Sequence, residues 1–357
     1  MNVAYFVTSH GYGHGVRSCA ISRCFPDDTG LFVRSGLPEA FFRQEIARPL
    51  TYVHTEFDCG CIQHDSITVD VPATVSRYRE IAESNCRVLE REVRWAQEHR
   101  IDIIVGDITP FAFDIACRAG IPSVAVTNFT WYDIYAPYVD RVPGFASVVD
   151  GMREQYGKAS VLLALRPAGD MPYFRRRIDM PPVGRAGHER RAHFRRQLGL
   201  APDSPLALVY LGGGGMDGMS FEGLGRFDGW SFVGTYPLPG APGNYHRLDP
   251  ATIHYADLVR SVDLVAGKLG YATVAECMIN GTPLLYLPRC EFAEYPVLER
   301  AVKAWGYGYC LSVEEYRMLR WGDVLEEVLQ TPSPLAGQAG GADACARAIV
   351  EIARDSG

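Results

Sequence analysis

The sequence lacks any apolar run that approaches the about 18 residues needed to cross a membrane as a helix. Its first residues also lack a basic segment, a long apolar core and a small-residue cleavage site, so we expect no secretory signal peptide. Without such a signal, the ten cysteines are typical of reduced thiols. We therefore expect a cytoplasmic protein whose cysteines do not form a framework of disulfide bonds.

Positive charge is also scarce, because 35 Lys and Arg residues stand against 42 Asp and Glu residues and give a formal net charge of −7. Nucleic-acid-binding domains are usually basic, so we expect no nucleic-acid partner. Metal-binding spacing is missing as well, since Cys59 and Cys61 are separated by one residue and are not followed by a second pair. The sequence therefore predicts no metal site.

Glycine and proline, in contrast, are abundant, with 36 and 23 residues in a chain of 357. Together they exceed the about 12% share of an average protein. They separate short apolar runs from longer amphipathic stretches, and the hydrophobic content of 47% is that of a globular protein. At about 100–200 residues per domain, the length indicates two domains.

Short apolar runs alternate with stretches of helical periodicity in both halves of the chain. In the first half we expect strands at 2–8, 31–34, 50–54, 101–105, 123–127 and 160–165, and helices at 16–24, 73–100 and 111–119. After a proline-rich linker at 181–184 the pattern restarts, with strands at 206–211, 230–234, 264–265 and 283–287, and helices at 273–280 and 342–354. Such alternation predicts the α/β class, with doubly wound parallel sheets whose ligands bind in a cleft at the C-terminal ends of the strands.

A glycine-rich turn, HGYGHG at 10–15, follows the first expected strand. It does not match the complete dinucleotide-binding fingerprint, which needs a third glycine at a fixed offset. A tight turn alone would explain the glycines. His10 and His14 favour a functional role, because imidazole is the usual general base near neutral pH.

Two candidate groups follow later strands of the first half. Asp107 comes directly after the expected strand at 101–105, where its carboxylate can orient a histidine base or, alternatively, cap the next helix. An aromatic-rich segment follows the strand at 123–127 and suits a sugar ring or a planar acceptor, although aromatic residues also simply pack together. Its candidate residues are Asn128, Trp131, Tyr132 and Tyr135.

A second glycine turn, Gly267–Gly270, opens the helix expected at 273–280. Backbone N–H groups at a helix start, together with Thr273, can hold a diphosphate, and Lys268 can neutralise it. Glu276 lies one turn further along the same helix face, where its carboxylate can accept hydrogen bonds from both ribose hydroxyls.

Two charged segments have more than one interpretation. Glu291 and Glu294 follow the strand at 283–287 and can grip sugar hydroxyls, although acids are also common in surface loops. The one basic stretch runs from Arg175 to Arg196 and suits either a phosphorylated or nucleic-acid acceptor, or a solvated linker and helix face.

Together these motifs resemble the nucleotide-sugar glycosyltransferases of the GT-B fold. The resemblance implies two Rossmann-like domains facing a cleft, with the acceptor on residues 1–183, the donor on 184–340, and a terminal helix at 341–357 that returns to the first domain. It places His14 at the position of the catalytic base, with His10 as the alternative, and Asp107 at the acid that partners this base. It also implies a donor-binding set: Gly213, Gly214, Lys268, Gly270, Thr273, Glu276 and Glu294.

The sequence departs from the family pattern at two positions: Lys268 replaces a histidine and Tyr295 replaces a glutamine. A more specific similarity is to the glycosyltransferase-like N-terminal half of plant L-arabinokinases, and it covers most of the chain. It rests on HGYGH at 10–14 followed by Arg17, VTNFTW at 126–131, GKLGY at 267–271 and the stretch 294–298. No phosphate loop of the GHMP kinase type is found, so kinase activity is not implied.

The resemblance implies an inverting, metal-independent glycosyltransferase that requires no cofactor. The expected donor is a nucleoside-diphosphate sugar, with UDP as the nucleotide, and the acceptor would lie near Asn128, Trp131, Tyr132 and Tyr135. Two alternatives remain open. One is a nucleotide-sugar epimerase or hydrolase that uses Glu291 and Glu294, and the other is a nucleotide-sugar-binding protein without catalysis.

Overall fold

The computed structural model describes residues 1–65, 67–211, 219–238, 240–289, 292–337 and 339–355. Contacts divide the chain into two compact units. Unit 1 comprises Met1–Ile62, Val69–Gly184 and Gly340–Gly357, and unit 2 comprises Gln63–Thr68 and Arg185–Ala339. The short segment Gln63–Thr68 thus lies with unit 2, which no feature of the sequence had indicated.

Unit 1 is built on a seven-stranded parallel sheet with the order β3-β2-β1-β4-β5-β6-β7. Its strands are β1 (Asn2–Val7), β2 (Gly30–Ser35), β3 (Thr51–His54), β4 (Ile103–Asp107), β5 (Ser123–Thr127), β6 (Val161–Leu165) and β7 (Arg177–Met180). Its helices are α1 (Tyr12–Arg23), α2 (Glu39–Glu45), α3 (Val71–Glu98), α4 (Phe111–Ala119), α5 (Trp131–Tyr135), η1 (Ala136–Tyr138), α6 (Ala146–Gly157) and α13 (Gly341–Asp355).

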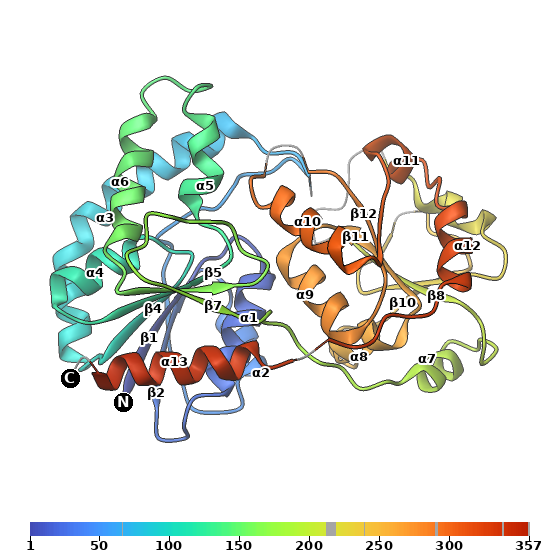
Figure 1. The fold of residues 1–357 in the computed structure, drawn as a ribbon, viewed down its shortest axis with the longest axis horizontal. Helices are drawn as coiled ribbons and strands as arrows, with labels where there is room; N and C mark the ends of the chain where they lie inside the picture. The colour runs from blue at the N-terminus through green and yellow to red at the C-terminus, as the bar shows by residue number, and fades with distance from the viewer. Residues whose placement is uncertain (66, 212–218, 239, 290–291, 338, 356–357) are drawn as a thin grey trace. The chain divides into compact units, whose positions relative to one another are not determined.

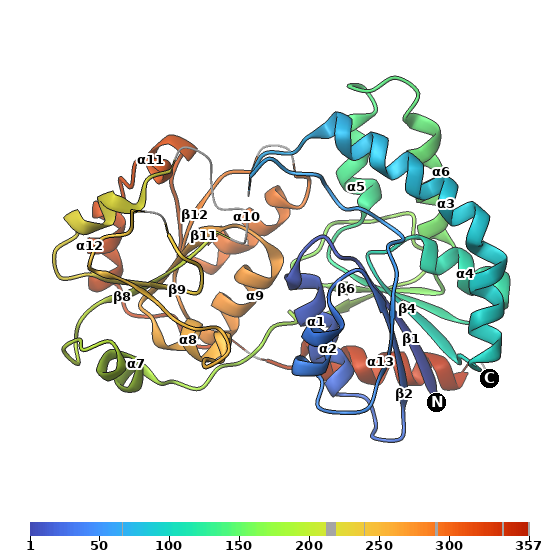
Figure 2. The same cartoon turned by 180° about the vertical axis from the view of Figure 1, so that it is seen from behind.

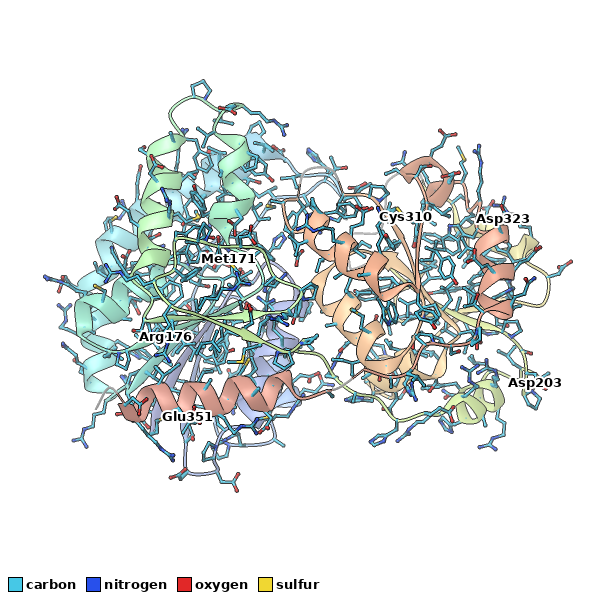
Figure 3. All side chains as sticks on the ribbon, in the orientation of Figure 1. Met171, Arg176, Asp203, Cys310, Asp323 and Glu351 are labelled. Atoms are coloured by element: carbon cyan, nitrogen blue, oxygen red, sulfur yellow. The ribbon has the colours of Figure 1, made fainter. Side chains whose placement is uncertain are left out.

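Helices cover both faces of this sheet (Figures 1 and 2). Helix α4 packs against α3 and α6 on one face, whereas α1 packs against α2 and α13 on the other. All residues of β4, β5 and β6 are therefore buried, as expected for the inner strands of a parallel sheet. Helix α13 is amphipathic, with Cys345 in the core and Glu351 on its exposed side (Figure 3).

Unit 2 contains a six-stranded parallel sheet with the order β10-β9-β8-β11-β12-β13. Its strands are β8 (Leu206–Tyr210), β9 (Ser231–Gly234), β10 (Tyr245–Arg247), β11 (Leu264–Lys268), β12 (Leu284–Leu287) and β13 (Gly308–Cys310). Its helices are α7 (Arg191–Gln197), η2 (Phe221–Arg226), α8 (Tyr255–Ser261), α9 (Tyr271–Asn280), α10 (Tyr295–Trp305), α11 (Val313–Arg317) and α12 (Gly322–Gln330).

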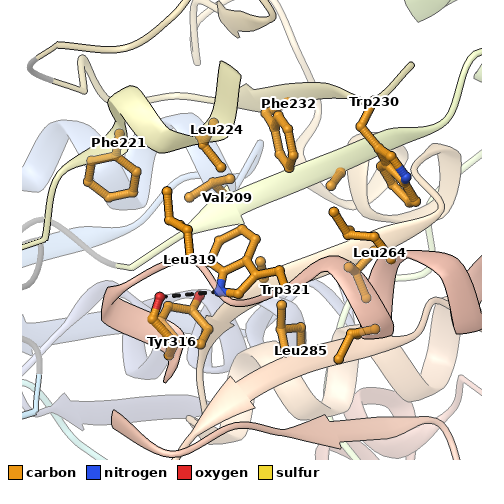
Figure 4. Close-up of a cluster of buried hydrophobic side chains, with 14 of the residues drawn as sticks. Val209, Phe221, Leu224, Trp230, Phe232, Leu264, Leu285, Tyr316, Leu319 and Trp321 are labelled. Atoms are coloured by element: carbon orange, nitrogen blue, oxygen red, sulfur yellow. Dashed lines mark hydrogen bonds between the residues drawn. The ribbon is translucent and has the colours of Figure 1, made fainter. Parts of the chain in front are cut away.

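The core on one side of the unit 2 sheet is centred on Trp321, which is fully buried (Figure 4). Its indole nitrogen donates a hydrogen bond to the backbone oxygen of Tyr316 at 3.2 Å. A buried indole needs such a partner, because an unsatisfied donor in the core costs about 1–3 kcal/mol. This cluster anchors α11 and α12 to the sheet.

In each sheet the chain begins in the third strand of the order, continues to the nearer edge, and then returns to build the other side. The direction of winding changes between β1 and β4 in unit 1, and between β8 and β11 in unit 2. Ligands of doubly wound sheets bind beyond the C-terminal ends of the strands at such a switch point. The fold therefore directs attention to the residues that follow these four strands.

Three strands were not predicted from the sequence, and all three lie at sheet edges: β7, β10 and β13. Helix α1 also begins at Tyr12 rather than at Val16, which places His14 inside the helix and not in the preceding turn. The aromatic-rich segment after β5 contains the short helix α5, which the sequence analysis did not predict. Within the described part of the chain, no helix combines the length and the apolar character needed to span a bilayer.

Candidate functional site

His14 and Asp107 meet at the switch point of unit 1. His14 lies in the first turn of α1, which follows β1, and Asp107 is the last residue of β4. The two strands are neighbours, with Val7 paired to Asp107, so both side chains start from the same edge of the sheet. His14 Nδ1 lies 3.0 Å from Asp107 Oδ1. The structure thus joins the two residues that the sequence singled out as base and partner.

The carboxylate of Asp107 is fully buried and accepts further hydrogen bonds from two residues of α1. Arg17 donates from Nη2 to Oδ1 at 2.6 Å and from Nε to Oδ2 at 2.7 Å, while Ser18 Oγ donates to Oδ2 at 2.9 Å. Burial raises the pKa of Asp107, but the charge and hydrogen bonds of Arg17 outweigh it and hold the pKa at about 2. Asp107 is therefore ionised at neutral pH.

The protonation of His14 follows from this arrangement. An ionised carboxylate only accepts hydrogen bonds, so Nδ1 of His14 carries the proton and Nε2 of the neutral ring keeps its lone pair. Burial lowers the pKa of His14, and the positive charge of Arg17 lowers it further against the opposing effect of Asp107. His14 is thus a neutral imidazole at pH 7 with a basic nitrogen available to accept a proton.

His10, the alternative base, is held in a different way. The backbone N–H of Cys61 donates to His10 Nδ1 at 3.1 Å, so the neutral ring carries its proton on Nε2. The ring packs edge-on against Trp131, with centroids 5.0 Å apart. His10 is therefore arranged to donate from Nε2, whereas His14 is arranged to accept there.

Gly60 allows His10 to lie in this position. Its φ is 57°, and a Cβ placed on it would lie 2.3 Å from His10 Nδ1. We expect Gly60→Ala to destabilise the protein by about 1–3 kcal/mol and to displace the ring. Gly120, with φ 71° and no atom within 4 Å of its Cβ position, is the matched control, because Gly120→Ala imposes backbone strain alone. Equal losses in denaturant unfolding would contradict the steric role of Gly60.

The predicted acceptor residues follow β5, and the structure buries three of the four. Trp131 and Tyr135 are 0% exposed and stack on each other, with centroids 5.7 Å apart, so their rings are covered by protein. Asn128 is buried as well and accepts a hydrogen bond from Arg17 Nη1 at 2.7 Å. Tyr132 is half-buried against Tyr173. The physical reason is the short helix α5, which turns two of the aromatic rings into the core.

A buried carboxylate that the sequence did not single out, Asp58, links the loops around this site. Thr8 Oγ1 donates to Asp58 Oδ1 at 2.5 Å, and Thr109 Oγ1 donates to Oδ2 at 2.7 Å. Burial raises the pKa of Asp58. Because Thr8, Asp58 and Thr109 follow β1, β3 and β4, this acid fixes the loop that carries His10. A single acid in an unpatterned loop offered no signal by which it could have been found.

In unit 2, the end of β11 gathers charged side chains. Lys268 is the last residue of β11, and Gly270 directly precedes α9. Burial lowers the pKa of Lys268 to about 8, and Arg289 acts in the same direction, against the opposing effects of Glu294 and Asp65. Arg289 and Glu294 are each 5% exposed. Arg289 was not predicted, and it places a buried cation near the half-buried Lys268.

The remaining predicted donor residues differ in their surroundings. Thr273 is half-buried in the first turn of α9. Glu276 is buried and accepts from Arg185 Nε at 2.7 Å, so the carboxylate expected to hold a ribose already has a partner within unit 2. Gly213, Gly214 and Glu291 lie outside the described residues.

The basic stretch is largely neutralised by acids of the same units. Besides the pair with Glu276, Arg190 Nε lies 2.9 Å from Asp257, and Arg195 Nη2 donates to Asp263 at 2.8 Å. Arg195 is 1% exposed, so it belongs to the core rather than to a solvated face. Among the described residues, no group of three or more His, Cys, Asp or Glu side chains is placed to hold a metal ion.

Comparison with known proteins identifies a related sequence and solved structures of the same fold. No family model matches the sequence. The chain is 31% identical to an L-arabinokinase of Arabidopsis thaliana over 357 residues, which cover 98% of this chain and 34% of the plant protein. The chain therefore spans about a third of the length of that relative.

Solved structures share the fold at low sequence identity. A UDP-glucosyltransferase from Polygonum tinctorium superposes with a TM-score of 0.66 at 13% identity, covering 99% of this chain and 93% of its own. The spinosyn rhamnosyltransferase SpnG gives 0.64 at 15% identity, covering 99% and 96%. The UGT2 of Phytolacca americana, in complex with UDP-2-fluoroglucose and pterostilbene, gives 0.62 at 12% identity, covering 99% and 94%. The chain has the GT-B fold, as its sequence predicted.

Proposed function

We propose that the protein is an inverting glycosyltransferase that moves a sugar from a nucleoside-diphosphate sugar, expected to be a UDP-sugar, to an acceptor nucleophile. The observation that carries the proposal is the pair of His14 and Asp107. A neutral imidazole whose Nδ1–H is held by an ionised carboxylate keeps a lone pair on Nε2, which is what a general base requires. The GT-B fold and the names of the structural neighbours support the same reaction class.

In the proposed reaction, an acceptor hydroxyl attacks the anomeric carbon of the donor sugar. The new bond forms between the acceptor oxygen and the anomeric carbon, while the bond from that carbon to the diphosphate oxygen breaks. The hydroxyl proton passes to Nε2 of His14, and the electron pair of the broken bond leaves with the nucleoside diphosphate. Attack from the side opposite to the leaving group inverts the anomeric centre.

The donor is proposed to lie on unit 2, where positive charge can stabilise the departing diphosphate. Lys268, Arg289 and the N-terminus of α9 supply this charge, and the N–H groups of a helix N-terminus favour an anion. Charge of this kind is usually a large share of catalysis, because it acts where negative charge develops. In this proposal the leaving group needs no metal ion.

The pKa of Lys268 makes donor binding dependent on pH. A group with a pKa of about 8 is a cation at pH 7 and loses its proton as the pH rises through 8. We therefore expect a UDP-sugar to raise the melting temperature at pH 7, and this rise to shrink above pH 8. A thermal-shift series of nucleotides and nucleotide sugars between pH 6 and 9.5 measures both effects.

The matched variants for this experiment are Lys268→Met and Lys303→Met. Lys303 lies in the same unit and is 62% exposed, so its loss changes the net charge equally without touching the proposed site. We expect Lys268→Met to weaken binding at pH 7 and to abolish the dependence on pH, and Lys303→Met to behave as wild type. If no nucleotide sugar raised the melting temperature of the wild type, the result would count against a donor site.

Incubation with a UDP-sugar in the absence of an acceptor separates transfer from the other chemistries of this fold. A transferase should leave most of the donor intact under these conditions. Rapid release or conversion of the sugar would instead favour a hydrolase or an epimerase.

A further inference from the structure

Arg17 shares the carboxylate of Asp107 with His14, because Arg17 Nη2 and His14 Nδ1 both bond to Oδ1. The proposed reaction gives Arg17 no role. His14, Arg17 and Ser18 lie at helical spacings of three and four residues, so α1 presents all three on one face. The Arg17 side chain is 2% exposed. Its third nitrogen, Nη1, donates to Asn128 Oδ1 at 2.7 Å, so the guanidinium is fixed from two sides.

The hydrogen bonds of Asp107 leave one orientation for His14. Each carboxylate oxygen accepts two hydrogen bonds: Oδ1 from His14 and Arg17, and Oδ2 from Arg17 and Ser18. Four donors fill the capacity of a carboxylate. Asp107 therefore cannot rotate to another partner without losing a charge-assisted bond, and the imidazole is held with Nδ1 inward and Nε2 outward.

The charges of the cluster are balanced only while His14 is neutral. Arg17 and Asp107 cancel, so a proton on His14 would add a net positive charge in a buried site. Among the described residues, Tyr5 from β1 and Cys345 from α13 are further titratable groups that act on this cluster, and burial raises the pKa of each. Both are neutral at pH 7 and provide no counter-charge.

We propose that Arg17 is a positioning residue. Through its two hydrogen bonds to Asp107, it fixes His14 as a neutral base and keeps the imidazole beside Asp107 from retaining a proton. The hold is a property of unit 1 alone, whereas its consequence for catalysis rests on the proposed function. A base of this kind takes the acceptor proton in the transition state and then returns it readily to solvent. It also stays in its active form at a lower pH than an ordinary histidine.

The test compares Arg17→Gln with Arg23→Gln on the same helix. Arg23 is 38% exposed and pairs with Glu45. Its loss therefore removes one positive charge that is far less buried than that of Arg17. The readout is the NMR titration of the His14 ring, identified by the signal that disappears in His14→Gln. In Arg17→Gln we expect the titration midpoint to rise by about one pH unit or more, because an unbalanced carboxylate stabilises the imidazolium. In Arg23→Gln we expect no shift.

Ring-nitrogen chemical shifts of the same samples report the tautomer. We expect wild-type His14 to show protonated Nδ1 and unprotonated Nε2, and Arg17→Gln to keep both nitrogens protonated up to a higher pH. An unchanged midpoint and tautomer in folded Arg17→Gln would overturn the proposal, and so would an equal shift in Arg23→Gln. These readouts do not require a known acceptor, so failure to detect transfer would count against the proposed function and leave this test valid.

Arg17→Lys provides a second variant should the glutamine protein fail to fold. Lysine keeps the charge but lacks the planar fork that binds both carboxylate oxygens. We expect the titration midpoint of His14 to stay low, and kcat for transfer to fall at least tenfold while KM for the donor is unchanged. A wild-type kcat in folded Arg17→Lys would show that the bidentate hold is dispensable and would overturn the proposal.

Discussion

Asp107→Ala should destabilise the protein by about 3–5 kcal/mol, the largest loss that we expect from any single substitution in unit 1. The reason is the guanidinium of Arg17, which would stay buried without the carboxylate that balances its charge. Removal of one member of a buried ion pair costs more than the pair contributes, since the remaining charge cannot regain its hydration. Denaturant unfolding followed by circular dichroism measures the loss.

Asp179→Ala is the matched control for this experiment. Asp179 lies in the same unit and also pairs with two arginines, Arg166 and Arg177, but it is 39% exposed. Exposed ion pairs contribute about 0–1 kcal/mol, so this variant should unfold close to the wild type. If the combination of Asp107→Ala with Arg17→Met does not recover part of the stability, the buried charge is not the cause of the loss.

The low pKa of Asp107 predicts how this stability depends on pH. The pKa falls from 3.8 to about 2 on folding, so the folded state favours the ionised form by about 2 kcal/mol. This contribution is complete above pH 4 and is lost as the pH falls through 2. In Asp107→Asn the same part of the acid dependence should be absent, and a steep loss of stability between pH 4 and 2 that matches the wild type would contradict the assignment.

The hydrophobic pattern of the sequence was sufficient for the inner strands and for a helix such as α4 that ends at a glycine. The expected strand at 123–127 and the expected helix at 111–119 coincide with β5 and α4, because a buried apolar run and a terminal glycine mark them without ambiguity. Edge strands have less of this signal. Strand β7 begins with the exposed Arg177, and β10 and β13 are three residues long, so neither periodicity nor length separates them from loops.

At the site, the chemical roles of the residues could be predicted from the sequence more reliably than their contacts. His14, Asp107 and Lys268 carry groups whose reactions are known from their type, and their places after strands indicated the correct edge of each sheet. Burial cannot be predicted from residue type, because the same aromatic ring can pack in a core or contact a ligand. The sequence left both an acceptor-binding role and core packing open for Trp131, and the structure buries it. Arg17 belonged to the motif shared with the plant proteins, but nothing in the sequence assigned it to Asp107.

His14→Ala should lower the rate of sugar transfer by about 10²–10⁴-fold, because the acceptor would lose the group that takes its proton. Binding of the donor should be unchanged, since the proposed donor site belongs to unit 2 and His14 to unit 1. The expected signature is therefore a loss of kcat with a donor-induced thermal shift equal to that of the wild type. A variant that lost both would have a damaged fold, and not only a missing base.

The control is His54→Ala, which removes an exposed histidine at the end of β3 in the same unit. We expect it to transfer sugar at the wild-type rate. His14→Gln refines the test, because glutamine can keep a hydrogen bond to Asp107 but cannot accept a proton near neutral pH. It should preserve stability better than alanine while remaining inactive. Transfer at an undiminished rate in either His14 variant would exclude His14 as the base and shift the role to His10, whose protonated Nε2 would first have to lose its hydrogen.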